Sequence, residues 1–184
     1  MGGGFFVHHT LLSKRDIPPL KPRMPITPFH LGPGAAFKAI GGRHFSFVVF
    51  GGTQVLMDLE PLVGLLRGSA VLHGYTHTLA GALVIGIVAA LTGKPIGGFV
   101  LARMRDSPCP IPWTAAISGA FVGTFSHIAF DAVMHGDMRP WWPLSNTNHL
   151  LRVASIERLH LICLALGAIG IAAIAGRALL RSKA

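Results

Sequence analysis

Four ionisable residues stand at helical spacing beside apolar runs of the sequence. His127 and Asp131 are four residues apart near the end of one run, and His73 and His77 repeat this spacing at the start of another. At 3.6 residues per turn, both members of each pair lie on one face of a helix. A charge inside a bilayer costs about 2.5–3.5 kcal/mol on insertion scales, so such groups need compensation. A divalent cation supplies it, because its ligands are deprotonated imidazole and carboxylate groups.

Further potential ligands stand at the ends of other apolar segments. Asp58 and Glu60 end the preceding run, and His30 follows Thr27-Pro28, which is typical of a helix start. Mixed imidazole and carboxylate ligands suit Zn, with Mn or Fe as alternatives, rather than Ca or Mg. The predicted metal ligands are His30, Asp58, His73, His77, His127, Asp131 and His135. A set of this size allows one to three ions, which activate water and hold a phosphoryl group.

Each pair also has a simpler interpretation. A single His-x-x-x-Asp on a helix is more often a hydrogen-bonded pair than a metal site. The metal interpretation therefore depends on several pairs converging at one end of the molecule. Glu157-x-x-His160 matches half of the ligand motif of di-iron helical bundles, but the sequence contains no second copy.

The composition indicates the environment in which these groups must fold. Of the 184 residues, 51% are hydrophobic and 12% are charged, and the mean hydropathy is +0.57. Soluble domains carry about 25% charged residues, so this chain cannot cover itself with a solvated surface. Disorder of the whole chain is excluded by the same numbers. The net charge is +9. We expect the lysines and arginines to contact anionic lipid and set the membrane orientation rather than bind nucleic acid.

Uncharged apolar runs predict the elements that must position the ligands. Four runs cover residues 44–57, 76–92, 111–130 and 161–176. They are long and rich in Ala, Gly and Leu without period-two alternation, which favours helices over strands. A weaker segment at 29–40 predicts a short or partly embedded helix. We therefore expect an all-α membrane bundle of about four to five helices with a metal site at one face.

Helix-breaking and small residues predict where the helices end and where they approach one another. One domain is expected over residues 24–184, after a disordered basic tail at residues 1–23. Gly119 and Gly123 form a GxxxG pattern that allows close approach of helices. The predicted helix breaks are Gly41-Gly42, Lys94-Pro95, Pro108 to Pro112 and Pro140 to Pro143.

Alternation of the five segments across the bilayer separates two kinds of residue. One membrane face receives the predicted metal ligands together with Glu60, Asp137, Glu157 and His160. The other face receives Arg43, Lys94, Arg103, Arg105, Arg177, Arg181 and Lys183. Because basic segments favour the cytoplasm, the predicted site faces the periplasm of a bacterial inner membrane.

Four stretches of the sequence resemble one family. They read MPITPFHLGPGAAFKA, LMDLEP, LHGYTHTLAGALVIG and SHIAFDAVMHGDMRPWWPLS. In this order they resemble the YdjM-like membrane-bound metal-dependent hydrolases, over Met24 to about Leu144. That family is similar in motif order to zinc-dependent phospholipase C. The resemblance implies a helical bundle with a metal cluster that hydrolyses phosphate esters.

The resemblance also implies roles for individual residues. His30 is the N-terminal ligand, and His77, His127 and Asp131 complete the central site, with Asp131 able to bridge two ions. Asp58 is implied as a ligand and general base, although Glu60 remains an alternative for the ligand. The phospholipases carry a later HxxxE pattern that is absent here, so two ions are expected rather than three. Candidate substitutes for that pattern are His135, His149, Glu157 and His160.

The leading hypothesis is a membrane-bound metal-dependent hydrolase whose metal-activated water attacks a phosphoester, such as a phospholipid headgroup. Asp58 or Glu60 is expected to accept the proton from the water. Arg139 is expected to pair with a substrate phosphate or, alternatively, with Asp137. The rival hypothesis is a non-catalytic membrane protein, either a metal or proton carrier or an accessory subunit of a partner membrane protein. A carrier needs polar groups that continue to the basic face, and the sequence has none between Leu79 and Leu91.

Overall fold

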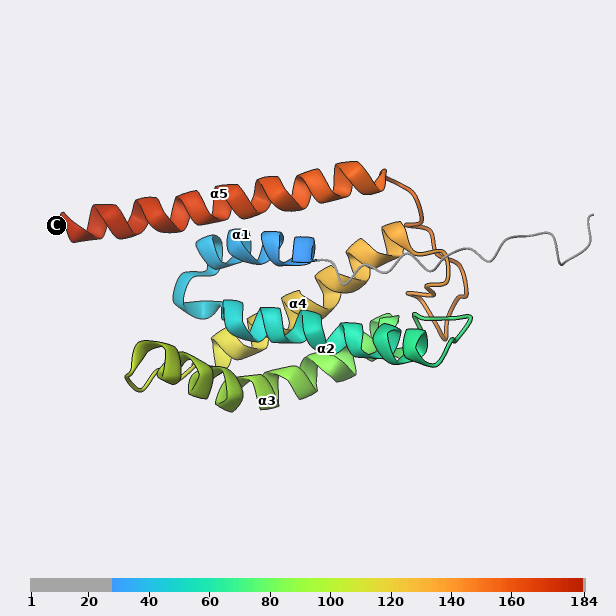
Figure 1. The fold of residues 1–184 in the computed structure, drawn as a ribbon, viewed down its shortest axis with the longest axis horizontal. Helices are drawn as coiled ribbons and strands as arrows, with labels where there is room; N and C mark the ends of the chain where they lie inside the picture. The colour runs from blue at the N-terminus through green and yellow to red at the C-terminus, as the bar shows by residue number, and fades with distance from the viewer. Residues whose placement is uncertain (1–27, 184) are drawn as a thin grey trace, which may run out of the picture.

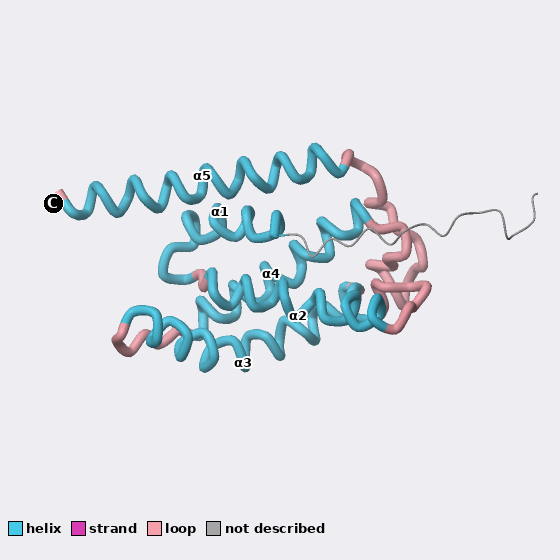
Figure 2. The backbone as a smooth tube through the Cα atoms, viewed as in Figure 1, coloured by secondary structure: helices cyan, strands magenta, loops and turns pink. Residues whose placement is uncertain are grey.

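The computed structural model describes residues 28–183, and these residues form helices joined by loops, with no strand among them (Figures 1 and 2). The predicted all-α class is confirmed. The tail at residues 1–23 lies outside the described residues. Three single turns of 3₁₀ helix, η1 to η3, accompany five α-helices. Their bounds are η1 Pro28–His30, α1 Leu31–Gly41, η2 Gly42–His44, α2 Phe47–Leu66, η3 Tyr75–His77, α3 Leu79–Arg105, α4 Trp113–Met134 and α5 Ile156–Ser182.

Four of these helices, α2 to α5, are long and apolar enough to cross a membrane. Helix α1 has 11 residues and, at 1.5 Å per residue, reaches only about 16 Å, half of a bilayer core. The weak segment at 29–40 therefore forms the short helix that the sequence predicts. Each spanning helix extends beyond its apolar run, because helix ends are fixed by capping and loop contacts rather than by hydropathy alone.

The predicted break at Lys94-Pro95 is wrong. Helix α3 continues through Pro95 to Arg105, so Lys94 lies within the helix instead of ending it. Proline is tolerated inside membrane helices because neighbouring groups satisfy the backbone carbonyl that loses its partner. The Lys94 ammonium lies 4.9 Å from the centre of the Trp113 ring, an arrangement that offsets part of the cost of its burial. Pro61 is likewise inside α2.

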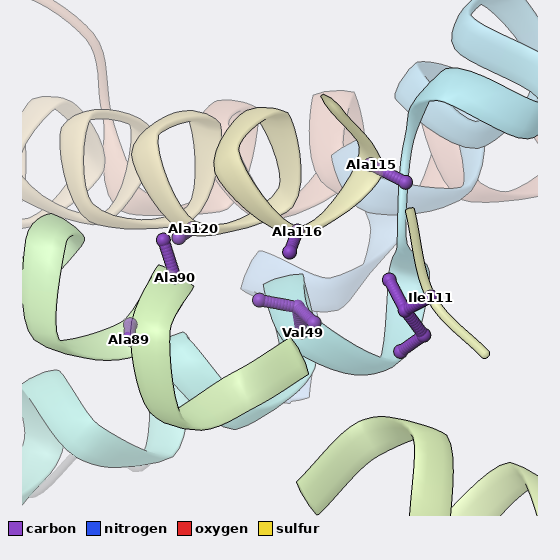
Figure 3. Close-up of a cluster of buried hydrophobic side chains, with 7 residues drawn as sticks. All are labelled: Val49, Ala89, Ala90, Ile111, Ala115, Ala116 and Ala120. Carbon is purple, nitrogen blue, oxygen red and sulfur yellow. The ribbon is translucent and has the colours of Figure 1, made fainter. Parts of the chain in front are cut away.

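Small residues bring the helices together. A cluster of mostly alanine side chains fills the space between α2, α3 and α4 (Figure 3). A Cβ atom on Gly119 of α4 would lie 2.5 Å from the Ser46 carbonyl oxygen, and one on Gly123 would lie 3.0 Å from Thr53. The GxxxG pattern therefore lets α4 approach α2 closely, as predicted. Helix α5 packs mainly on α1, where Gly167 and Gly170 meet the first turns of α1.

The five helices run alternately in opposite directions (Figure 1). This arrangement gathers the start of α1, the end of α2, the start of α3 and the end of α4 at one end of the bundle. The long loops at 67–74 and 135–155 close the same end (Figure 2). The helix ends that carry Arg103, Arg105, Arg177 and Arg181 lie at the other end. Among residues 28–183, alternation thus separates the potential ligands from most of the lysines and arginines, with Arg67, Arg139, Arg152 and Arg158 as the exceptions.

Candidate metal centre

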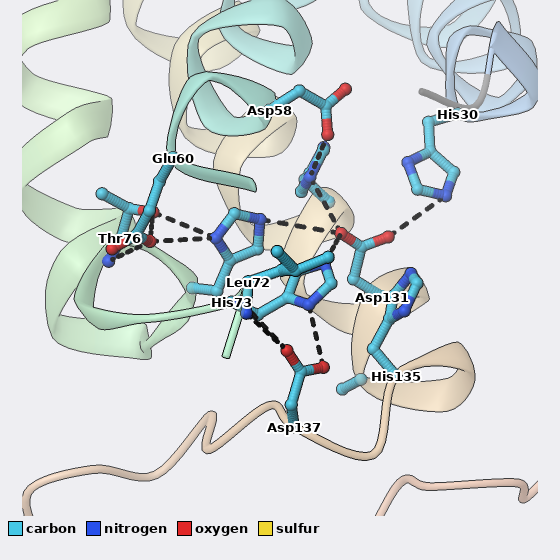
Figure 4. A network of polar contacts seen from close by, with 12 residues as sticks. His30, Asp58, Glu60, Leu72, His73, Thr76, Asp131, His135 and Asp137 are labelled. Atoms are coloured by element: carbon cyan, nitrogen blue, oxygen red, sulfur yellow. Dashed lines mark hydrogen bonds and ion pairs between the residues drawn. The ribbon is translucent and has the colours of Figure 1, made fainter. Parts of the chain in front are cut away.

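Asp131, in the last turn of α4, lies at the centre of a group of histidines. Its carboxylate is buried, and four imidazole Nε2 atoms surround it (Figure 4). The Oδ2 atom lies 3.1 Å from Nε2 of His127, 3.7 Å from that of His77 and 3.9 Å from that of His73. The Oδ1 atom lies 3.7 Å from Nε2 of His30. Four histidines from three parts of the chain therefore aim the same ring atom at one carboxylate.

Each element contributes a side chain at a point where the backbone fixes its position. His127 and Asp131 share one face of α4, as their spacing predicts. His30 closes η1 directly before α1, and His77 closes η3 directly before α3. Thr78 caps α3 by accepting a hydrogen bond from the Gly81 N–H at 2.9 Å, which fixes the helix start beside His77.

The potential ligand atoms form two overlapping groups. In the described part of the chain, His30, His127 and Asp131 bring their ligand atoms within 4.8 Å of one another, and so do His73, Asp131 and His135. The rings of His73 and His135 are stacked with centres 4.2 Å apart. Asp131 belongs to both groups. The geometry thus fits a metal site in which both groups of ligand atoms include Asp131.

Unpaired ring nitrogens support the fit to a metal. The Nε2 atoms of His30, His77, His127 and His135 are buried and form no hydrogen bond, although the first three lie 3.1–3.7 Å from the Asp131 oxygens. Most buried polar side-chain atoms do have a partner, so several orphans in one place require an explanation. A metal ion is the partner that accepts electron pairs from imidazole nitrogens and carboxylates together.

A second set of side chains holds the opposite nitrogens of three rings. His73 Nδ1 lies 2.9 Å from Asp137 Oδ1, and His77 Nδ1 lies 3.5 Å from Glu60 Oε2. His127 Nδ1 lies 2.8 Å from Gln54 Oε1. Metal-binding histidines usually donate their second N–H to such an oxygen, which fixes the tautomer and ring orientation. Gln54 is not a usual ligand of Zn, Mn or Fe, and its role is not predicted from the sequence; its only signal is a position four residues before Asp58.

Burial favours the neutral, ligating form of three histidines. It lowers the pKa of His30 to about 4, despite the opposing charge of Asp131. Burial also lowers the pKa of His77 and of His135. Burial opposes ionisation of Asp137, but hydrogen bonds from His73 and from the Leu72 N–H hold the pKa of that carboxyl below its usual range. Neutral imidazole and ionised carboxylate are the forms that bind a cation.

The two candidate carboxylates of α2 occupy different places. Asp58 Oδ1 lies 3.4 Å from His127 Nε2, at the edge of the centre. Glu60 points toward the loop before α3, where it accepts hydrogen bonds from the Gly74 and Thr76 N–H groups at 3.2 and 3.1 Å and from the Thr76 hydroxyl. The structure therefore places Asp58 beside the potential ligand atoms. Glu60 lies on the opposite side of the His77 ring, near its Nδ1 atom.

Other predicted residues lie around the centre. Arg139 is exposed and lines a pocket of about 250 Å³ together with His73. Between residues 28 and 183, no ion pair joins Arg139 to Asp137. His160 stacks on Phe29 with ring centres 4.3 Å apart. Among the residues described, neither group of potential ligand atoms includes His149, Glu157 or His160.

Comparison with known proteins gives one match. The sequence model of the YdjM inner membrane protein family matches residues 38–182, which is more than half of the chain. The matched range contains each predicted ligand except His30. No curated protein and no solved structure shows significant similarity to the chain.

Proposed function

The chain belongs to the YdjM inner membrane protein family, and from this membership and the geometry of its centre we propose that it is a metal-dependent hydrolase of phosphoesters. Membership and the four apolar helices make it an integral membrane protein. The observation that carries the proposal is that Asp131 belongs to both groups of potential ligand atoms. Two ions held this way would supply Lewis-acid stabilisation of phosphoryl oxygens and an activated water.

The surrounding side chains have separate tasks in this proposal. His30, His127 and Asp131 would hold one ion, and His73, His135 and Asp131 would hold the other, with His77 beside Asp131. Asp58 lies at the edge of the centre with 21% of its side chain exposed, so it can accept the proton of the attacking water. Glu60 and Asp137 orient His77 and His73. Zn suits the imidazole-rich ligand set, with Mn and Fe as alternatives.

The interior of the bundle favours a hydrolase over a carrier. Toward the opposite end, α2, α3 and α4 enclose Val49, Ala89, Ala90, Ile111, Ala115, Ala116 and Ala120 (Figure 3). The buried Thr53 hydroxyl donates to the Val49 carbonyl of its own helix, and the Thr124 hydroxyl to the Phe121 carbonyl. A conduit would instead need polar groups that remain available to the ion.

The orientation belongs to the same proposal. The end of the bundle opposite the centre carries Arg103, Arg105, Arg177, Arg181 and Lys183. If this end faces the cytoplasm, as basic segments prefer, the centre opens toward the periplasm. There it meets the headgroups of the outer leaflet of the inner membrane.

Metal analysis tests the proposal first. Full-length protein, purified in detergent without chelators, is analysed by inductively coupled plasma mass spectrometry beside His127→Ala and Asp131→Asn. We expect about two equivalents of Zn, Mn or Fe in the parent protein, and loss of metal in both variants together with hydrolysis of bis-p-nitrophenyl phosphate. A parent protein that binds no added metal, or a metal-free His127→Ala variant with full activity, would overturn the proposal.

A further inference from the structure

A pocket of about 250 Å³ opens next to the metal centre at the loop end of the bundle. His73 forms part of its wall, and the same ring directs Nε2 toward Asp131. The Asp137 carboxylate lies within hydrogen-bond distance of the other ring nitrogen, Nδ1 (Figure 4). A molecule in the pocket would therefore contact one of the potential metal ligands directly.

The pocket combines an apolar rim with one cation, Arg139, and one carboxylate, Asp137. Val71, Tyr75 and Trp142 line it, and the Tyr75 and Trp142 rings meet edge to face with centres 5.0 Å apart. All three are exposed to solvent, with 55%, 70% and 38% of their surfaces accessible. Tyrosine and tryptophan concentrate where headgroups meet acyl chains. This rim therefore has the composition of a surface that lies at the membrane interface.

Arg139 supplies the positive charge of the pocket. The Asp137 carboxylate also lines the pocket, but it already accepts hydrogen bonds from the Leu72 N–H, the His73 N–H and His73 Nδ1. In the described chain the Arg139 guanidinium forms no ion pair. Guanidinium groups bind phosphate oxygens in a bidentate manner. An arginine beside a metal-centred hydrolytic site is therefore complementary to an anionic phosphoester.

We propose that this pocket is the subsite that selects a lipid-borne, anionic phosphoester, with Arg139 on the phosphate and the Tyr75–Trp142 pair against the first carbons of the lipid. The inference rests on the proposed hydrolase function. Pockets for whole drug-sized ligands have about 300–1,000 Å³, so this one accommodates a headgroup while the acyl chains stay in the bilayer. The subsite therefore favours amphiphilic phosphoesters over soluble ones.

Binding to the metal-free protein tests the subsite separately from catalysis. The full chain is treated with EDTA in detergent, and dihexanoyl phosphatidic acid and inorganic phosphate are each titrated by isothermal calorimetry. We expect Arg139→Gln and Trp142→Ala each to weaken binding of the lipid probe about tenfold or more. Matched controls are Trp141→Ala, the adjacent exposed tryptophan, and Arg158→Gln, an exposed arginine at the same end that does not line the pocket.

The outcomes separate the two possible sources of phosphate. Tight binding of inorganic phosphate that Trp142→Ala leaves unchanged would overturn lipid selection. Equal losses in the two control variants, or no binding by the parent protein, would overturn the subsite itself. Absence of metal in the parent protein refutes the proposed function instead, and it leaves a positive lipid titration standing.

Discussion

His127 Nδ1 lies 2.8 Å from Gln54 Oε1, so the Gln54 amide in α2 orients the His127 ring in α4. The amide nitrogen of Gln54 donates to the Gly123 carbonyl at 3.1 Å, which leaves the amide oxygen as the acceptor for the ring. His127 then carries a proton on Nδ1, so in the neutral ring it is Nε2 that offers a lone pair to a metal ion. A buried glutamine thus prepares a histidine for metal binding before any metal arrives.

Replacing Gln54 by Ala should weaken metal binding although Gln54 is not a ligand. The variant leaves Nδ1 of His127 without its acceptor and frees the ring to rotate. Loss of such an outer partner typically costs about 10–100-fold in metal affinity. Competition with a chromophoric chelator measures the affinity, and Gln54→Glu, which keeps an acceptor oxygen, should retain more of it than Gln54→Ala. Unchanged affinity in Gln54→Ala would contradict the role of the amide.

The shared carboxylate predicts a difference in metal stoichiometry between variants. Asp131→Asn weakens both groups of ligand atoms, so it should lose both ions. His30→Ala removes a ligand from one group only, and His135→Ala from the other only, so each should retain about one equivalent. Mass-spectrometric metal analysis measures the ratio, with Asp106→Asn at the opposite end as the control. Equal stoichiometry in Asp131→Asn and His30→Ala would refute the bridging position of Asp131.

The sequence predicts the helices of this fold better than their ends. Apolar runs locate all four spanning helices, because burial in lipid demands the same composition along a whole segment. They do not predict that α3 passes through Pro95. Continuation there depends on the neighbours of the helix, which a local pattern does not contain. Ser155, which accepts a hydrogen bond from the Arg158 N–H, starts α5 well before its uncharged run begins.

The residues that could bind a metal can be predicted from the sequence, but the separate role of each residue cannot. The spacing of His127 and Asp131 places them on one face of a helix, and the alternation of the helices brings His30 to the same end. Whether Asp58 or Glu60 faces the centre depends on a rotation of α2 and on the loop before α3. That loop turns Gly74 toward Glu60, where a Cβ atom would lie 2.5 Å from Oε1. Such long-range contacts leave no local pattern in the sequence.

The positions of Asp58 and Glu60 predict different defects. Asp58→Asn removes the base beside His127 and should lower kcat by about 100-fold or more, even at saturating metal. Glu60→Gln loosens the loop and His77 and should weaken metal binding while largely keeping kcat once metal is saturating. Steady-state hydrolysis of bis-p-nitrophenyl phosphate over a range of metal concentrations separates the two effects. A larger fall of kcat in Glu60→Gln would assign the base to Glu60 instead.

Close packing of α4 on α2 predicts opposite effects for two glycines. A Cβ atom on Gly119 would meet the Ser46 carbonyl at 2.5 Å, whereas one on Gly52 of α2 meets nothing within 4 Å. Gly119→Ala should therefore force the helices apart and cost about 1–3 kcal/mol. Gly52→Ala should be neutral or stabilise by up to about 1 kcal/mol, because alanine favours helix more than glycine does. Thermal unfolding in one detergent, followed by circular dichroism, compares the two. Because His127 reaches Gln54 across the same interface, Gly119→Ala should also weaken metal binding. An unchanged Tm together with unchanged metal affinity in this variant would contradict the close contact between α2 and α4.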